Sequence, residues 1–111
     1  MHKITFSEYQ SLSADTRIYP EKFQVIYPSL GLSGEVGEVL ELVKKALRDE
    51  NGTFSDERLS KLHKELGDIM WYLAAVCEDL GFDLGEVATA NLEKLKSRKE
   101  RDVLGGSGDE R

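Results

Sequence analysis

The sequence has few of the side chains on which most enzyme sites depend. It contains one cysteine and two histidines among its 111 residues. A lone cysteine excludes an intramolecular disulfide, and Cys77 lies on the apolar stripe of its segment, as expected for a reduced core residue. The chain has no Ser-His-Asp pattern, no P-loop motif and no C-x-x-C motif. Nucleophilic catalysis by a side chain therefore has no candidate.

Long hydrophobic runs, strand patterns and an excess of positive charge are also missing. The longest apolar run, Ile69 to Cys77, is far shorter than the roughly 20 residues of a membrane span, and the start, MHKITFSEYQ, has no signal-peptide core. No segment alternates with the period of a strand. The net charge of −6 argues against a protein that holds a nucleic acid polymer through its phosphates. We expect a cytoplasmic all-α protein that binds neither membrane nor nucleic acid polymer.

Helix start and stop signals divide the chain into four long segments. A capping box from Thr5 to Glu8 opens the first. The expected helices cover about 6–16, 28–48, 55–80 and 83–101, with Gly81 as a left-handed cap, and the stretch 20–28 is a short helix or an ordered loop. We expect one all-α domain over 1–104, a bundle of four to five helices, followed by a glycine-rich tail at 105–111 whose default state is disorder.

Two stretches, Glu35 to Leu40 and Glu65 to Met70, repeat one pattern of acid, aliphatic residue, glycine, acid and two apolar residues. The i,i+3 spacing places both acids of a pair on one helix face, at the edge of the apolar stripe. If the two helices pack antiparallel through those stripes, both pairs line one cleft, and such a cluster of like charges favours a bound cation. The four acids are Glu35, Glu38, Glu65 and Asp68.

A metal site competes with the alternative of a solvated acidic face, which is common in a chain with 32% charged residues. Two acid pairs in the same helical phase favour the metal. Carboxylates without nearby histidine or cysteine suit Mg²⁺, with Mn²⁺ as a substitute. Gly37 and Gly67 each cost a helix about 1 kcal/mol relative to alanine, so we expect another helix backbone to approach them closely.

A polar row of Asn91, Lys94 and Arg98 follows one face of the last helix. Lys94 and Arg98 can take phosphate oxygens that a metal ion leaves free. The alternative is a helix C-terminus whose positive charges interact favourably with the dipole. The aromatic residues Trp71, Tyr72 and Tyr27 either stack on a substrate base or pack between helices.

The string GLSGEVGEVLELVKKAL, followed by KELGDIMWYLA and ANLEKLKSRK, strongly resembles the MazG-like all-α nucleoside triphosphate pyrophosphohydrolases, a superfamily that includes dimeric dUTPases. The resemblance covers about residues 30–111. It implies hydrolysis of an NTP or dNTP to the monophosphate and pyrophosphate by dimers or tetramers. It also implies that the four acids hold Mg²⁺ and that Lys94 and Arg98 hold phosphate. For the mechanism we expect Glu35 or Glu38 to orient or deprotonate the attacking water and Asp68 to be an obligate metal ligand. Asn91, in the same row as Lys94 and Arg98, is expected to contact the substrate phosphate as well.

Two other functions compete with the enzyme. One is a catalytically weak, nucleotide-binding or regulatory helical oligomer, and the other is a purely structural helical dimer. A family pseudo-enzyme would be expected to lack one of the four acids, and all four are present here, which favours the enzyme.

The helix expected over 55–80 is apolar almost all round, since Trp71 and Ala75 point away from its main apolar stripe. A lone protomer would leave Trp71 in water. We therefore expect a homodimer or homotetramer that packs either the helices over 55–80, or these together with the helices over 28–48, across a two-fold axis. Gly67, Ala74 and Ala75 would allow the helices to approach closely.

Overall fold

The computed structural model of this protein describes residues 2–111. Over this range the chain is all-helical and contains no strand, which confirms the predicted fold class. The helices are α1 (Phe6–Ser13), α2 (Ile26–Asp49), α3 (Asp56–Leu80) and α4 (Leu84–Glu100), and two 3₁₀ turns occupy Ala14–Thr16 and Glu21–Phe23. None of these described helices is long and apolar enough to cross a membrane.

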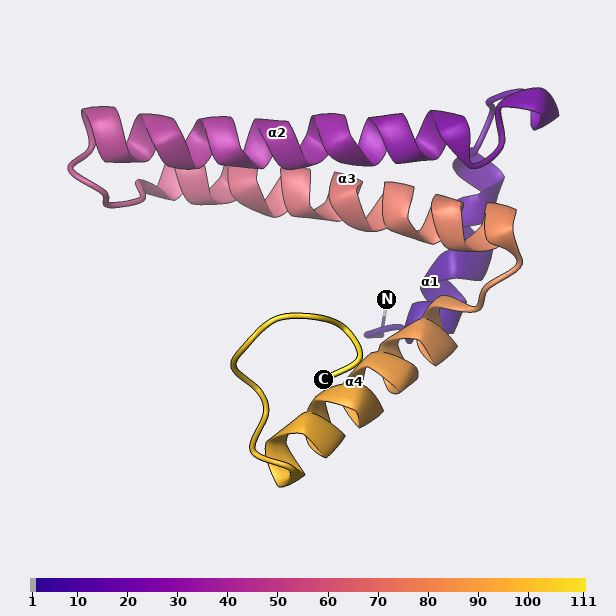
Figure 1. Cartoon of the computed structure of the whole chain (residues 1–111). Coiled ribbons are helices and arrows are strands. Elements are labelled where there is room, and N and C mark those ends of the chain that lie inside the picture. The colour runs from indigo at the N-terminus through magenta and orange to yellow at the C-terminus, as the bar shows by residue number, and fades with distance from the viewer. Residues whose placement is uncertain (1) are drawn as a thin grey trace.

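α2 and α3 lie side by side as a long antiparallel hairpin (Figure 1). α1 packs at one end of this hairpin, and α4 leaves the same end as a second arm. α3 is therefore the element that contacts each of the other three helices. The hairpin carries the predicted acids, whereas the predicted basic row lies on the α4 arm.

Most helix ends agree with the sequence signals. The capping box of α1 is complete, since Thr5 Oγ1 accepts the Glu8 N–H at 3.1 Å and the Glu8 carboxylate accepts the Thr5 N–H at 2.9 Å. Gly81 caps α3 with a left-handed φ of 78°. At the start of α4 the Asp83 carboxylate accepts the Glu86 N–H at 2.9 Å and caps the helix.

The start of α2 differs from the prediction. The helix begins at Ile26, so Pro28 lies inside its first turn, where the missing N–H breaks no helix bond. Val25 precedes the helix with a positive φ of 67°, which β-branched residues rarely adopt. Its N–H donates to Asp79 Oδ2 on α3 at 2.9 Å, and the Tyr19 hydroxyl donates to the same oxygen at 2.8 Å. Asp79 therefore holds the segment 19–25 against α3.

The buried core lies where α1 and α4 join the hairpin. Ala74, Cys77 and Leu84 form it, and Tyr9 and Met70 pack against them. The burial of Cys77 confirms the core position predicted for this residue.

A buried glutamine links α1 to the turn between α3 and α4. Gln10 is only 5% exposed. Its Nε2 donates to Glu78 Oε2 at 2.7 Å and to the Phe82 carbonyl at 2.8 Å, and its Oε1 accepts the Leu84 N–H at 2.6 Å. Both the amide nitrogen and the amide oxygen of Gln10 therefore stabilise the connection between the hairpin and α4.

We expect Gln10→Ala to lower the free energy of unfolding by about 2–4 kcal/mol, because it leaves buried backbone groups of the α3–α4 turn without partners. Urea denaturation measures the loss. The matched control is Gln24→Ala, since Gln24 is exposed, and it should change the unfolding free energy by less than about 0.5 kcal/mol. Equal small effects in both variants would contradict the structural role of Gln10.

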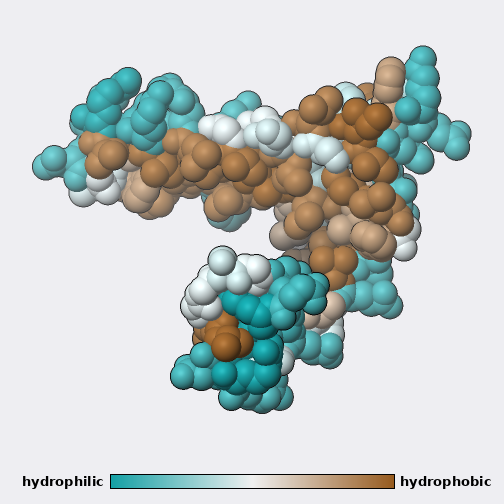
Figure 2. Space-filling view, viewed as in Figure 1, coloured by the Kyte–Doolittle hydropathy of each residue, from teal (hydrophilic) through white to brown (hydrophobic). Residues whose placement is uncertain are grey.

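Most of the apolar stripe of the hairpin stays exposed in a single chain. Leu40 is 62% exposed, Leu47 71% and Leu66 55%. Figure 2 shows the resulting hydrophobic band along the hairpin. The prediction that α2 and α3 bury these stripes against each other is wrong for these leucines, because two helices shield only the narrow seam between them.

The other side of α3 is covered by the chain itself. Trp71 Nε1 donates to Thr16 Oγ1 at 2.6 Å, and Ala74 and Ala75 have no exposed surface. The prediction that a lone protomer leaves Trp71 in water is therefore wrong, and so is the prediction that Ala74 and Ala75 admit a second copy. The segment between α1 and α2, which has no helical periodicity, covers Trp71 through Thr16, whereas Ala74 lies in the core beside Tyr9 and Leu84.

Within one chain, the prediction that another helix backbone approaches Gly37 and Gly67 closely is wrong. A Cβ added to Gly37 or Gly67 would meet nothing within 4 Å, so no other element of the described chain approaches either glycine. Gly31 has the close contact instead, because a Cβ there would collide with the Tyr72 ring. This contact fixes Tyr72 beside the first turns of α2.

Residues 105–111, predicted to be disordered by default, form a closed loop. Arg111 holds this loop through its guanidinium group, which donates to the carbonyl oxygens of Gly105 at 3.0 Å and Leu104 at 3.1 Å. Composition alone does not predict such closure, because it depends on one side chain that reaches back to several carbonyl groups.

Candidate metal centre

The hairpin brings three of the four predicted acids together. Glu35 and Glu38 on α2 and Glu65 on α3 each offer one carboxylate oxygen, and these three oxygens lie within 4.8 Å of one another. The i,i+3 spacing aligns the first two, and the antiparallel packing sets the third opposite them. Asp68 lies outside this group of three, one helical turn after Glu65 on α3.

Two of the clustered carboxyl groups, Glu38 and Glu65, have raised pKa values. The Glu65 carboxylate is the main cause that raises the pKa of Glu38, and burial and the charge of Asp68 add to it. The Glu35 carboxylate is the main cause that raises the pKa of Glu65, again with burial and Asp68 adding. Asp68 therefore acts on the same cluster, although its oxygens are not among the three closest.

These raised pKa values predict how pH changes the stability of the metal-free protein. A carboxyl group with a raised pKa holds its proton in the folded state when the unfolded chain has released it, so stability falls as the pH rises above the ordinary value of 4.5. In EDTA, Glu38→Gln should therefore raise the melting temperature at pH 7 but change it little at pH 4. Glu93→Gln, at an exposed position on α4, is the control. If Glu38→Gln changed the melting temperature equally at pH 7 and at pH 4, repulsion between these acids would be contradicted.

The cluster fits a hard divalent cation. Glu35 Oε2 and Glu65 Oε2 are buried and accept no hydrogen bond from any of the residues 2–111. A buried carboxylate oxygen without a donor is costly unless a cation compensates its charge. Because all the available ligands are carboxylate oxygens, the cluster can hold a divalent metal ion of the Mg²⁺ or Mn²⁺ kind.

The cluster opens to solvent on one side. Glu38 and Glu65 line a cavity of 220 Å³ together with Glu41, Leu42 and Lys61. Lys61 pairs with Glu57 at 3.2 Å and Glu41 with Lys44 at 2.7 Å, so neighbouring charges are satisfied outside the cluster. A water molecule or a substrate can therefore reach Glu38 from the cavity.

The predicted basic row lies apart from these acids. Asn91 is exposed, Lys94 is half-buried and Arg98 is buried, all on α4. Lys94 and Arg98 form ion pairs with Asp109 of the C-terminal loop, and across the described chain neither forms one with the four acids. A single protomer therefore does not bring the predicted phosphate ligands and metal ligands together.

An aromatic group near the start of α2 was only partly predicted. Tyr19 and Tyr27 stack with ring centroids 4.9 Å apart, and both line a cavity of 360 Å³ with Phe23 and Trp71. Burial and the bond to Asp79 raise the pKa of Tyr19 to about 12. The sequence indicated Tyr27 and Trp71 as possible base-stacking residues. Tyr19 was missed because its segment has no periodicity.

Comparison with known proteins gives a family and a relative. A model of the MazG nucleotide pyrophosphohydrolase domain matches residues 28–102, which include the acid cluster and the basic row. A protein of Mycobacterium phage L5 named Gene 37 protein is 44% identical over 109 residues, covering 93% of this chain and 96% of the phage protein. Its name states no activity. No solved structure shows a significant match.

Proposed function

Because this chain belongs to the MazG nucleotide pyrophosphohydrolase family, we propose that it is a Mg²⁺-dependent enzyme that hydrolyses a nucleoside triphosphate, NTP or dNTP, to the monophosphate and pyrophosphate. The observation that carries the proposal is the convergence of Glu35, Glu38 and Glu65, with two of their buried oxygens lacking any donor in the described chain. A solvated acidic face would have no reason to bury those oxygens.

The exposure of each acidic residue indicates its role in catalysis. Glu35 and Glu65, which are half-buried and have unpartnered oxygens, are the main metal ligands, and Glu38 and Asp68 complete the set. When bound, the metal ion lowers the pKa of water and neutralises charge on the polyphosphate. Glu38 is exposed to the cavity, so it is the carboxylate that orients the attacking water and accepts its proton.

Lys94 and Arg98, with Asn91 beside them, bind the phosphate oxygens that the metal ion leaves free. Arg98 and Lys94 donate charge-assisted hydrogen bonds, which phosphate accepts well. Within one chain these residues lie on a separate arm from the acids. We therefore propose that the α4 arm of a second copy supplies the phosphate ligands and completes the site.

A second copy is expected for a physical reason as well. The exposed leucines of the hairpin form a continuous band (Figure 2), and a two-helix hairpin has no further layer to cover it. Two hairpins that pack through these bands would form a four-helix bundle with a shared core. We propose a homodimer built this way, with a homotetramer as the larger assembly of the same unit.

The experiment that tests the function is a product assay across the common NTPs and dNTPs with Mg²⁺. Formation of pyrophosphate and nucleoside monophosphate supports the proposal. Release of single phosphates, or no turnover with any of these substrates, rejects it. Nucleotide binding without turnover would instead favour a regulatory nucleotide-binding oligomer.

A further inference from the structure

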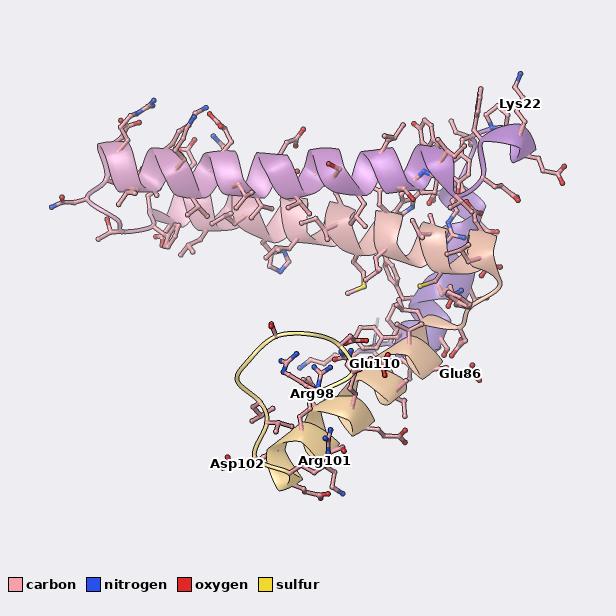
Figure 3. The ribbon with its side chains drawn as sticks, in the orientation of Figure 1. Lys22, Glu86, Arg98, Arg101, Asp102 and Glu110 are labelled. Carbon is pink, nitrogen blue, oxygen red and sulfur yellow. The ribbon has the colours of Figure 1, made fainter. Side chains whose placement is uncertain are left out.

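The C-terminal loop, residues 101–111, places one acid on both cations of the basic row. Asp109 Oδ1 accepts from Lys94 Nζ at 2.7 Å and from Arg98 Nη2 at 2.9 Å. Arg98 Nη2 also donates to the Asp109 carbonyl oxygen at 2.6 Å. Figure 3 shows Arg98 pointing from α4 into this loop. One carboxylate oxygen is therefore shared between two positive side chains.

The two sides of this contact differ in burial. The Arg98 side chain is 6% exposed, whereas the Asp109 side chain is 74% exposed. Arg98 Nε has no hydrogen-bond partner anywhere in residues 2–111. Lys94, first, and then Arg98 hold the pKa of the Asp109 carboxyl below its usual range. The protein thus presents a buried cation with unused donor capacity to a carboxylate that solvent can reach.

The loop is closed by contacts that do not involve Asp109. At the end of α4, Asp102 adopts a left-handed φ of 59°, and the Val103 N–H donates to the Arg98 carbonyl at 2.8 Å, which is a Schellman reversal. Arg111 holds the far end on the carbonyl groups of Leu104 and Gly105. Asp109 can therefore leave Lys94 and Arg98 while the chain reversal after α4 persists.

We propose that the C-terminal loop is an internal competitor for phosphate, in which Asp109 occupies the place on Lys94 and Arg98 that a phosphate oxygen takes when a polyphosphate binds. The proposal rests on the assignment of this pair to phosphate in the proposed function. Binding of the polyphosphate and release of Asp109 are then one equilibrium, and the apparent affinity is lowered by the fraction of protein in which Asp109 is bound.

The competition favours long phosphate chains over single phosphates. A single phosphate would replace the Asp109 oxygen shared by Lys94 and Arg98 with one of its own oxygens, so it gains little binding free energy. A polyphosphate brings further oxygens, which can also use the two protons of Lys94 Nζ that Asp109 does not accept. The loop therefore disfavours retention of single-phosphate ligands while admitting the triphosphate chain.

The test measures binding of inorganic tripolyphosphate in EDTA by calorimetry, so that neither metal nor turnover contributes. Asp109→Asn should bind about 10-fold more tightly than wild type, because it removes the competing charge. The matched control is Asp102→Asn, which removes the same charge from the same loop, and asparagine tolerates the left-handed conformation. The affinity of this control variant for tripolyphosphate should stay within about 2-fold of wild type, because salt screens the charge of an exposed residue.

A second readout follows the loop itself. Amide hydrogen exchange over 103–111 should speed up in wild type when tripolyphosphate binds, and not in Arg98→Ala. Equal affinity in wild type and Asp109→Asn, or weaker binding in Asp109→Asn, would overturn the competitor, since weaker binding would mean that Asp109 positions the cations. Unchanged affinity in Arg98→Ala would overturn it too. The Mg²⁺ product assay tests hydrolysis independently, because tripolyphosphate binding is measured without turnover.

Discussion

Glu38→Gln and Asp68→Asn should each reduce kcat by at least about 100-fold, the effect typical of removing a positioned acid–base group or a metal ligand. Each change keeps the size of the side chain and removes its charge, so the hairpin should stay folded. Both variants should also weaken the rise in melting temperature that Mg²⁺ gives by binding the folded state. Pyrophosphate release measures the first effect and thermal denaturation with and without Mg²⁺ the second.

The matched control is Glu41→Gln. Glu41 lines the same cavity as Glu38 and Glu65, but it pairs with Lys44 at 2.7 Å and is not among the three converging acids. Its loss should change kcat by less than about 3-fold, since a surface ion pair contributes little. Helix content measured by circular dichroism should match wild type in all three variants. Full turnover in either Glu38→Gln or Asp68→Asn would remove that residue from the site.

The parts of the site that the sequence predicted are those set by short-range periodicity. Glu35 and Glu38 share a face because of their spacing, and antiparallel packing of two apolar stripes brings Glu65 to the same place. Helix ends such as Thr5 and Gly81 carry local signals that act within a few residues. Such features need no knowledge of distant parts of the chain.

The parts that the sequence missed depend on single long-range contacts. Trp71 is covered because Thr16, far away in sequence, accepts its indole N–H. The contact of Tyr72 with Gly31 has no periodic signal, and neither has the bond between Gln10 and the α3–α4 turn. The loop at the C-terminus closes on Arg111 although its glycines favour disorder. Each of these contacts joins segments whose own composition gives no hint of a partner.

Leu47→Glu should convert the dimer to a monomer. Leu47 is 71% exposed in one chain and lies on the apolar stripe of α2, near the far end of the hairpin from the core. Burying one leucine contributes about 1.5–3 kcal/mol, and a two-fold interface contains the residue twice. The substitution should therefore raise the dimer dissociation constant by about 100-fold or more, and a buried unpaired carboxylate adds to that loss. Light scattering at micromolar protein measures the change in mass.

Leu92→Glu is the matched control, since Leu92 is 67% exposed but lies on α4, outside the hairpin band. It should leave the dimer mass unchanged, because the shared core of the proposed four-helix bundle is built from the exposed leucines of α2 and α3 and does not contain Leu92. The melting temperature of wild type should rise with protein concentration, as mass action requires when folding and association are coupled, and that of Leu47→Glu should not. A wild-type mass of one chain at micromolar concentration would contradict the assembly. So would a dimer that survives Leu47→Glu, because the hairpin band would then face solvent rather than a second copy.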